Sequence, residues 1–337
     1  MKILVTGGAG FIGGNFIACA LRENRADEIV CMDKLTYAGN MHTLSGALKD
    51  PRFRFYRGDI ACKKDVEEVF RKESPDAVIN FAAESHVDRS IAHPSVFLKT
   101  NVSGVGVLLD ACRKYGNVRF HQVSTDEVYG DLPIGGKGDA FTEDSPLRPS
   151  SPYSASKASA DLLALAYFRT YGLPVTLSRC SNNYGPFQFP EKLIPLALTH
   201  ILRGEPVPVY GTGENVRDWL FAEDHCAAIR LILQKGEPGR VYNVGGRCER
   251  SNLEVVRAII SAVGKGEYTF VADRPGHDLR YAIDPSRTES VGWAPKVPFE
   301  EGLQRTVAWY LSHEEWWKGI LDGSYRAYNK EFYGSKR

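Results

Sequence analysis

Short apolar runs alternate with amphipathic stretches through the first half of the chain. Residues at helical spacing recur over 11–25, 64–72, 101–115 and 153–171. The runs typical of buried strands lie between these stretches, and they are KILVT, EIVCMD, RFRFYRG, DAVINFA, VRFHQVS and PVTLSRC. Strands separated by helices pair in parallel, so the pattern predicts an α/β fold with a doubly wound parallel sheet.

The alternation loosens after Gly185 into proline-rich and aromatic pieces with shorter helices. The stretches HCAAIRLILQKG and RVYNVGG are exceptions, because they have the pattern of a helix and a strand that return to the first sheet. We therefore expect a larger domain over residues 1–185, joined by residues 226–250. A smaller α/β region should follow over residues 186–337.

Composition and charge exclude several classes of protein. The 337 residues are 25% charged and 43% hydrophobic, with a net charge of +1, which does not favour nucleic acid or an anionic membrane as a partner. The seven scattered cysteines contain no C-x-x-C pair, which indicates a reducing compartment. His86, His121 and His277 lack metal-ligand spacing, so we expect no metal.

No apolar run approaches the roughly 20 residues of a membrane span, and the N-terminus lacks a signal-peptide pattern, so we expect a cytoplasmic protein.

Gly7, Gly8, Gly10 and Gly13 lie between the first predicted strand and the first predicted helix. They satisfy G-x-G-x-x-G, in which glycines permit a tight turn and bring a pyrophosphate close to a helix N-terminus. Asp33 ends the second predicted strand, where an acidic side chain binds the ribose 2′-hydroxyl and repels a 2′-phosphate. A glycine-rich turn alone is a weak signal. In this context it predicts a Rossmann site for NAD rather than NADP.

A tyrosine and a lysine begin the helix predicted from residue 153. Tyr153 and Lys157 are four residues apart, so they project from nearly the same face. The rest of the helix is apolar on more than one side, which favours a buried helix over a surface pair. Tyrosine has a pKa of about 10, so its use as a base near neutral pH requires about 3 pKa units, or roughly 4 kcal/mol. We expect the Lys157 ammonium and the positive nicotinamide ring to supply this by stabilising the phenolate.

Two adjacent carboxylates, Asp126 and Glu127, follow the strand predicted over residues 117–123. Charged pairs are unusual at the end of a buried strand, because charges resist desolvation. The pair is therefore either a solvated acidic loop or two proton-transfer groups. Two carboxylates whose environments separate their pKa values can divide the roles of acid and base.

The motifs TGGAGFIG and YSASK together resemble the extended short-chain dehydrogenase/reductase family. Within its nucleotide-sugar branch, the chain is similar to the dTDP-glucose 4,6-dehydratases over essentially its whole length. Gly14 departs from the serine that relatives often carry, but it lies beyond the three essential glycines. The supporting motifs are DKLTYAGN, FAAESHVDRSI, STDEVYG, SPYSASK, RCSNNYGP, PEKLIPL, NVRDWL, DRPGHDLRY and a WW pair near the C-terminus.

This resemblance implies an NAD-dependent hydro-lyase that converts dTDP-glucose to dTDP-4-keto-6-deoxy-glucose. Tyr153, with Lys157 and Thr125, would take the C4 hydroxyl proton while hydride leaves C4. The resulting ketone acidifies the C5 hydrogen. The family then assigns Glu127 as the base at C5 and Asp126 as the acid for the departing C6 hydroxyl, before reduction at C6.

The resemblance also implies the remaining binding residues. The expected cofactor contacts are Gly7, Gly10, Phe11, Ile12, Gly13, Asp33, Lys34, Leu35, Thr36, Asp59, Ile60, Ala82, Ala83, Thr100, Tyr153, Lys157 and Asn183. The expected substrate contacts are Ser85, Thr125, Asn182, Lys192, Leu193, Pro208, Tyr210, Arg217, Asn252, Asp273, Arg274 and His277. Asn252 has a competing interpretation as the N-cap of a helix.

Several alternatives stay open. A UDP-sugar 4,6-dehydratase differs only in the base that it binds, and the sequence does not separate thymine from uracil. An epimerase or decarboxylase of the same family would share the glycine motif and the Tyr–Lys pair, although the two carboxylates argue against an epimerase. A non-catalytic NAD-sensing protein is the alternative from a different class. The additional apolar faces of residues 101–115 and 153–171 fit a homodimer packed through two long helices.

Overall fold

The computed structural model of the chain describes residues 1–23, 27–135, 139–273 and 278–323. None of the helices in this part of the chain is both long enough and apolar enough to cross a membrane. The strands are β1 (Lys2–Thr6), β2 (Glu28–Asp33), β3 (Phe53–Arg57), β4 (Ala77–Asn80), β5 (Arg119–Thr125), β6 (Val175–Cys180), β7 (Asn182–Tyr184), β8 (Val207–Tyr210), β9 (Val216–Phe221), β10 (Val241–Val244), β11 (Glu249–Ser251) and β12 (Tyr268–Val271).

Helices separate most of the strands. The α-helices are α1 (Phe11–Glu23), α2 (Lys63–Glu73), α3 (Val87–Ala92), α4 (Pro94–Phe97), α5 (Val105–Lys114), α6 (Pro152–Tyr171), α7 (Leu193–Arg203), α8 (Ala222–Lys235), α9 (Asn252–Val263), α10 (Ser286–Ser290), α11 (Phe299–Ser312) and α12 (Glu314–Leu321). The 3₁₀-helical turns are η1 (Met41–Leu44), η2 (Ala47–Lys49) and η4 (Asp126–Tyr129), and η3 (Leu98–Gly104) is a π-helical turn.

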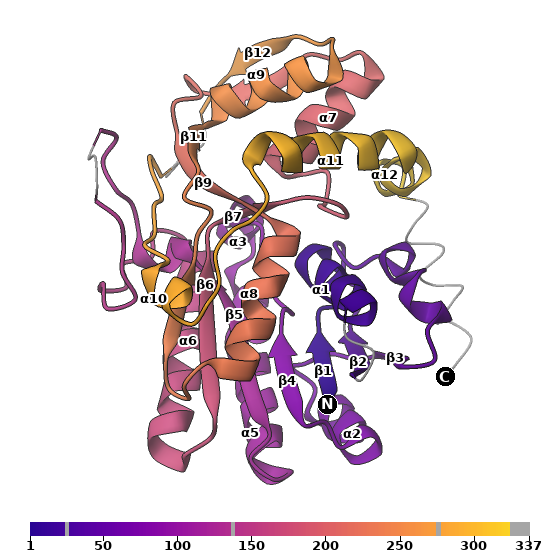
Figure 1. Cartoon of the computed structure of the whole chain (residues 1–337), viewed down its shortest axis with the longest axis vertical. Helices are drawn as coiled ribbons and strands as arrows, with labels where there is room; N and C mark the ends of the chain where they lie inside the picture. The colour runs from indigo at the N-terminus through magenta and orange to yellow at the C-terminus, as the bar shows by residue number, and fades with distance from the viewer. Residues whose placement is uncertain (24–26, 136–138, 274–277, 324–337) are drawn as a thin grey trace.

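Seven parallel strands form the larger sheet of the described residues, in the order β3-β2-β1-β4-β5-β6-β10. The predicted α/β fold with a doubly wound sheet is confirmed (Figure 1). Chain order reverses between β1 and β4, so the loops after these strands leave in opposite directions. Ligands of open α/β sheets bind beside the carboxyl ends of the strands at such a point.

Two layers of helices cover this sheet. Alternate residues of a strand point to opposite faces, so Leu4 packs with α2, α5 and α6, while Ile3 and Val5 pack with α1 and α8. Both faces are therefore buried, which explains why these strands are nearly continuous apolar runs.

The stretch that was expected to return to the first sheet supplies α8 and β10. β10 pairs in parallel with β6, with Val241 opposite Leu177. The rest of the C-terminal half forms two small sheets, β11-β9-β7 and β12-β8. In Figure 1 this smaller region, with α7, α9, α11 and α12, lies above the carboxyl ends of the larger sheet.

Two local details differ from the sequence expectation. The helix expected over residues 101–115 is interrupted, because η3 is a π-helical turn that precedes α5. This turn lets buried Asn101 bond to both backbone groups of Glu84 and to the hydroxyl of Ser156. Wide turns of this kind are frequent at functional sites.

The N-cap interpretation of Asn252 is wrong. Ser251 caps α9, since its hydroxyl accepts from the Glu254 amide and the Glu254 carboxylate accepts from the Ser251 amide. This is a reciprocal capping box, and Asn252 is the first residue inside the helix.

Candidate active site

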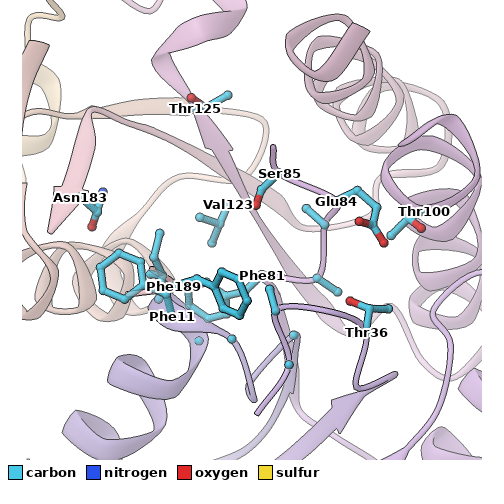
Figure 2. A pocket seen from close by; sticks show the side chains of 18 of the residues that line it. Phe11, Thr36, Phe81, Glu84, Ser85, Thr100, Val123, Thr125, Asn183 and Phe189 are labelled. Carbon is cyan, nitrogen blue, oxygen red and sulfur yellow. The ribbon is translucent and has the colours of Figure 1, made fainter. Parts of the chain in front are cut away.

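A deep cleft opens at the carboxyl ends of the larger sheet, where residues from both halves of the chain meet (Figure 2). The glycine loop after β1 and the end of β2 form one side. The ends of β4 and β5 and residues after β6 and β7 also line the cleft. Among the labelled side chains, Thr125, Asn183 and Ser85 bring polar groups to it, and Phe11, Phe81 and Phe189 bring aromatic rings.

The glycine loop has room for a pyrophosphate but not for side chains. Gly7 has φ of +72°, a conformation that suits glycine. A Cβ atom on Gly13 would lie 2.4 Å from the carbonyl oxygen of Gly7. The first turn of α1 therefore packs directly on the loop, with its amide groups facing the cleft as in a dinucleotide site.

Asp33 stands at the end of β2, where the ribose contact was expected. One of its carboxylate oxygens accepts from the amide of Ala9 at 2.9 Å, and the other accepts from the amide of Leu35 at 2.8 Å. Its cationic neighbour Lys34 forms an ion pair with Asp59 at 2.8 Å. The carboxylate is thus fixed in place, and the adjacent positive charge is already neutralised. This arrangement fits NAD better than a cofactor with a 2′-phosphate.

A tight turn places the two adjacent carboxylates. β5 continues to Thr125, and η4 begins at the next residue. The Thr125 hydroxyl caps this turn by accepting from the Glu127 amide at 3.3 Å. In a continuing strand Asp126 and Glu127 would point to opposite faces. Because the turn interrupts the strand, both side chains line the cleft.

The environments of the two carboxylates differ. Asp126 is 2% exposed, and its Oδ2 atom has no hydrogen-bond partner among the described residues. Burial raises the pKa of Asp126 well above its ordinary value, and the charges of Glu127 and Asp218 raise it further. Asp126 therefore holds its proton to a higher pH than an ordinary carboxyl, whereas Glu127 is only half-buried. This is the asymmetry that a paired acid and base require.

Tyr153 and Lys157 extend from the first two turns of α6. This helix begins with a capping box between Ser151 and Ser154, which fixes its first turn. The Lys157 ammonium donates to the carbonyl of Val123 on β5 at 2.6 Å. The helix start is thereby tied to the strand that carries Thr125.

The protein's own groups raise the pKa of Tyr153. Burial raises the pKa of Tyr153 well above that of a free phenol, and the Glu127 carboxylate raises it further. Only the hydrogen bond with Thr125 opposes this shift among the principal causes. The Lys157 ammonium is directed to the Val123 carbonyl. Its stabilisation of the phenolate, together with the positive ring of a bound nicotinamide, stays a prediction.

The structure brings most of the expected residues to one cleft. Of the expected cofactor contacts, the lining contains all but Leu35 and Tyr153. Of the expected substrate contacts, it contains Ser85, Thr125, Asn182 and Lys192. The other described substrate residues lie on or beside the small sheets, outside this lining, and are Leu193, Pro208, Tyr210, Arg217, Asn252 and Asp273. Arg274 and His277 lie outside the described residues.

Arg217 differs in detail from the forked anion contact expected of it. Its guanidinium donates to the carbonyls of Val216 and Asp278, at 2.7 and 2.9 Å, and lies 4.4 Å above the ring of Tyr281. The side chain is only 6% exposed. Its role toward a diphosphate stays a prediction. To bind the diphosphate, the guanidinium would have to give up hydrogen bonds to these carbonyls and donate to the ligand instead.

Several lining residues were not predicted as site residues. The sequence carried a signal for five of those named below, because they lie within motifs shared with the family, and these are Phe81, Glu84, Ser124, Cys180 and Glu191. Gln188 and Phe189 come to the cleft only through tertiary contacts described below. The unpredicted lining residues include Phe81, Glu84, Val123, Ser124, Cys180, Gln188, Phe189 and Glu191. Within the described part of the chain, no cluster of three His, Cys, Asp or Glu side chains could hold a metal ion.

Replacing Asp126 by asparagine should change how stability depends on pH. The folded-state pKa of Asp126 is raised above its unfolded value of about 3.9. The stability that this shift contributes is therefore complete below the unfolded pKa and is lost as pH rises through the folded pKa. Each unit of difference corresponds to about 1.4 kcal/mol. Between acid and neutral pH, the free energy of unfolding of Asp126→Asn should therefore fall less than that of the wild type. At pH 7 the variant should be more stable than the wild type.

Urea unfolding across this pH range would measure the effect. Asp144→Asn, at an exposed position, controls for the loss of one negative charge. An unchanged pH dependence in Asp126→Asn would show that the carboxyl is ionised in the folded protein.

Comparisons with known proteins agree with this geometry. The family model described as GDP-mannose 4,6 dehydratase matches residues 4–306. A dTDP-glucose 4,6-dehydratase of Xanthomonas campestris is 52% identical, with 96% of this chain and 97% of that protein covered. The dTDP-glucose 4,6-dehydratase of Salmonella typhimurium is 45% identical over 100% of both chains.

Solved structures give the same result. The dTDP-glucose 4,6-dehydratase of Bacillus anthracis in complex with NAD matches with a TM-score of 0.88 and 49% identity, covering 95% of this chain and 99% of that one. A UDP-glucose 4-epimerase of Thermus thermophilus in complex with NAD matches with a TM-score of 0.86 and 34% identity, covering 93% of this chain and 100% of that one. The glycine loop, the Tyr–Lys helix and the full-length similarity together place the chain in the dTDP-glucose 4,6-dehydratase family, within the wider group that the GDP-mannose 4,6 dehydratase model describes.

Proposed function

We propose that this chain is a hydro-lyase that converts dTDP-glucose to dTDP-4-keto-6-deoxy-glucose with a bound NAD. The observation that carries the proposal is the Asp126–Glu127 pair next to a dinucleotide site. One carboxyl is buried with a raised pKa, and the other faces the cleft. An enzyme that only oxidises and reduces at C4 needs no such pair. Elimination of water across C5 and C6 needs both an acid and a base.

NAD would lie along the glycine loop, with Asp33 at its ribose and Thr100, Lys157 and Asn183 beyond. When bound, it supplies a reversible hydride acceptor for the sugar. The chain's own residues provide the rest of the chemistry. Tyr153 takes the proton of the C4 hydroxyl as the phenolate, the form that the Lys157 ammonium and the positive ring of a bound NAD would stabilise. The hydrogen bond with Thr125 favours the same form.

The two carboxylates then act on C5 and C6. Glu127 removes the C5 proton, which the C4 ketone has made acidic. Asp126 donates its proton to the C6 hydroxyl, which leaves as water. The burial that raises the pKa of Asp126 favours its protonated form, which is the form that an acid needs before the substrate binds. Glu127 later returns a proton to C5.

The division of labour between the two halves of the chain is part of the same proposal. Residues 1–185, with residues 226–250, would hold the cofactor. Residues 186–337 would contribute most contacts to the nucleotide sugar. In support, the small sheets that carry Pro208, Tyr210, Arg217 and Asp273 lie above the carboxyl ends of the larger sheet (Figure 1).

A substrate panel tests the proposed function. dTDP-glucose, UDP-glucose and GDP-mannose should be incubated separately with the full-length protein and NAD, and the products analysed by mass spectrometry and NMR. dTDP-glucose should lose one water and gain a C6 methyl group. Loss of water from UDP-glucose at a higher kcat/KM would instead make the chain a UDP-sugar dehydratase. Inversion at C4 without water loss would make it an epimerase, and no turnover of any sugar would favour an NAD-sensing protein.

We also propose that the protein is a homodimer. Large apolar side chains are exposed on neighbouring elements of the larger domain, and they are Ile91 on α3, Val96 on α4, Leu98 on η3, and Leu162 and Tyr171 on α6. Leu162 is 59% exposed in the middle of the longest described helix. Exposed apolar side chains gathered on neighbouring elements typically mark a protein interface.

Leu162→Arg should convert the dimer to a monomer at micromolar concentration, because it places a charge at the centre of this face. Sedimentation velocity would measure the change. Leu311→Arg is the matched control, since Leu311 is 48% exposed on α11, away from these elements. A wild-type protein that sediments as a monomer would contradict the proposal.

A further inference from the structure

After β7 the chain crosses the cofactor cleft as residues 186–191, which we call the covering segment. Gln188, Phe189 and Glu191 of this segment line the cleft. Figure 2 shows Phe189 on the same side of the pocket as Phe11, which follows the glycine loop. The covering segment therefore borders the space in which the proposed NAD would lie.

One set of contacts ties the covering segment to the cofactor-binding elements. The Asn15 amide group on α1 donates to the carbonyl of Pro186 at 2.8 Å. The Phe189 ring meets the ring of Tyr37 edge to face at 5.5 Å. The Tyr37 hydroxyl in turn donates to the Glu191 carboxylate at 3.0 Å. The segment thus bridges α1 and the loop after β2, which flank the cleft.

A second set of contacts ties the same segment to the C-terminal helices. Phe187 packs edge-on against Trp309 of α11 at 4.9 Å and against Trp316 of α12 at 6.1 Å. The Tyr310 hydroxyl donates to the carbonyl of Gln188. The two aromatic residues of the segment therefore have different contacts. Phe189 lines the cleft, and Phe187 packs against the C-terminal helices.

The backbone conformation of Phe187 shows that these contacts are specific. Its φ is +65°, a left-handed conformation that is unfavourable for a bulky residue. Such a conformation persists only where the surrounding structure over-determines it. Here the two indole rings and the Tyr310 hydroxyl hold the turn. The WW motif of the sequence thereby gains a role, because Trp316 is its first residue.

We infer that Phe187, Trp309 and Trp316 form a latch that keeps NAD in the cleft through the catalytic cycle. The inference rests on the proposed function, in which the sugar must be reduced by the cofactor that oxidised it. A dehydratase that lost this cofactor midway would strand an oxidised sugar. The three aromatic residues lie outside the cleft lining, so they are positioning residues that act through the covering segment.

Phe187→Gly tests the latch with little disturbance of the backbone. Glycine adopts a positive φ readily, so the turn is retained while the ring is lost. Trp316→Leu removes the partner instead. Full-length proteins loaded with NAD would be diluted into an NAD glycohydrolase, and the NAD that stays bound would be measured over time. Both variants should release NAD at least about tenfold faster than the wild type, and should contain less NAD when purified.

Val307→Ala is the control for general destabilisation, since it weakens the core around α11 without removing an aromatic ring. It should lower the Tm and leave the NAD release rate unchanged. Wild-type release rates in Phe187→Gly and Trp316→Leu would overturn the latch, and so would equally fast release in Val307→Ala. The proposed function is tested separately, because it fails if the wild type does not dehydrate dTDP-glucose, whatever the release rates are.

Discussion

Tyr153→Phe should lose both oxidation at C4 and loss of water, with turnover of dTDP-glucose reduced by about 10² to 10⁴. The substitution removes the one hydroxyl that is proposed to start the reaction. The ring, its 8% exposure and its edge contact with Phe97 are retained. Binding of NAD should therefore be unaffected. Rapid-mixing absorbance of the reduced nicotinamide and product analysis would measure the two steps separately.

A hydroxyl on the same helix provides the control. The Tyr167 hydroxyl donates to Asp110 near the surface, well along α6 from the cleft. Tyr167→Phe should keep wild-type turnover. If Tyr153→Phe made product at a rate near that of the wild type, Tyr153 would have no place in the mechanism.

Glu127→Gln should stop the reaction one step later. The proposed base at C5 is lost while Tyr153, Lys157 and Thr125 remain, so the sugar is oxidised at C4 but does not eliminate water. Loss of one general base slows that step by about 10² to 10⁴. The reduced form of the bound cofactor should accumulate when the variant is mixed with dTDP-glucose, as seen by its near-ultraviolet absorbance.

Comparison with Asp126→Asn separates the base from the acid. Both variants should stall before water is lost, but they differ in exchange of the C5 hydrogen with solvent deuterium. Asp126→Asn keeps Glu127 and should exchange this hydrogen, whereas Glu127→Gln should not. Rapid C5 exchange in Glu127→Gln would assign the base to another group. Failure of C4 oxidation in a folded Glu127→Gln that binds NAD would contradict the order of steps.

Elements that depend on local pattern can be predicted from the sequence alone. The apolar runs are strands because both faces of the larger sheet are buried, as Leu4 and Val5 illustrate. The glycine loop is recognisable because its shape depends on the absence of Cβ atoms at residues such as Gly13. Tyr153 and Lys157 lie four residues apart within α6, a spacing that places both on nearly one face of a helix.

Features that depend on burial and on contacts between distant segments followed from the folded structure alone. Asp126 and Glu127 are neighbours in sequence, yet burial and the charge of Asp218, from another element, raise the pKa of Asp126. The raised pKa of Tyr153 has the same origin, since burial is its largest cause. Phe187 and Phe189 differ in role only because Trp309 and Trp316 lie on one side of the covering segment and the cleft on the other. Sequence spacing specifies which groups can meet, but desolvation and long-range packing set their charge state and position.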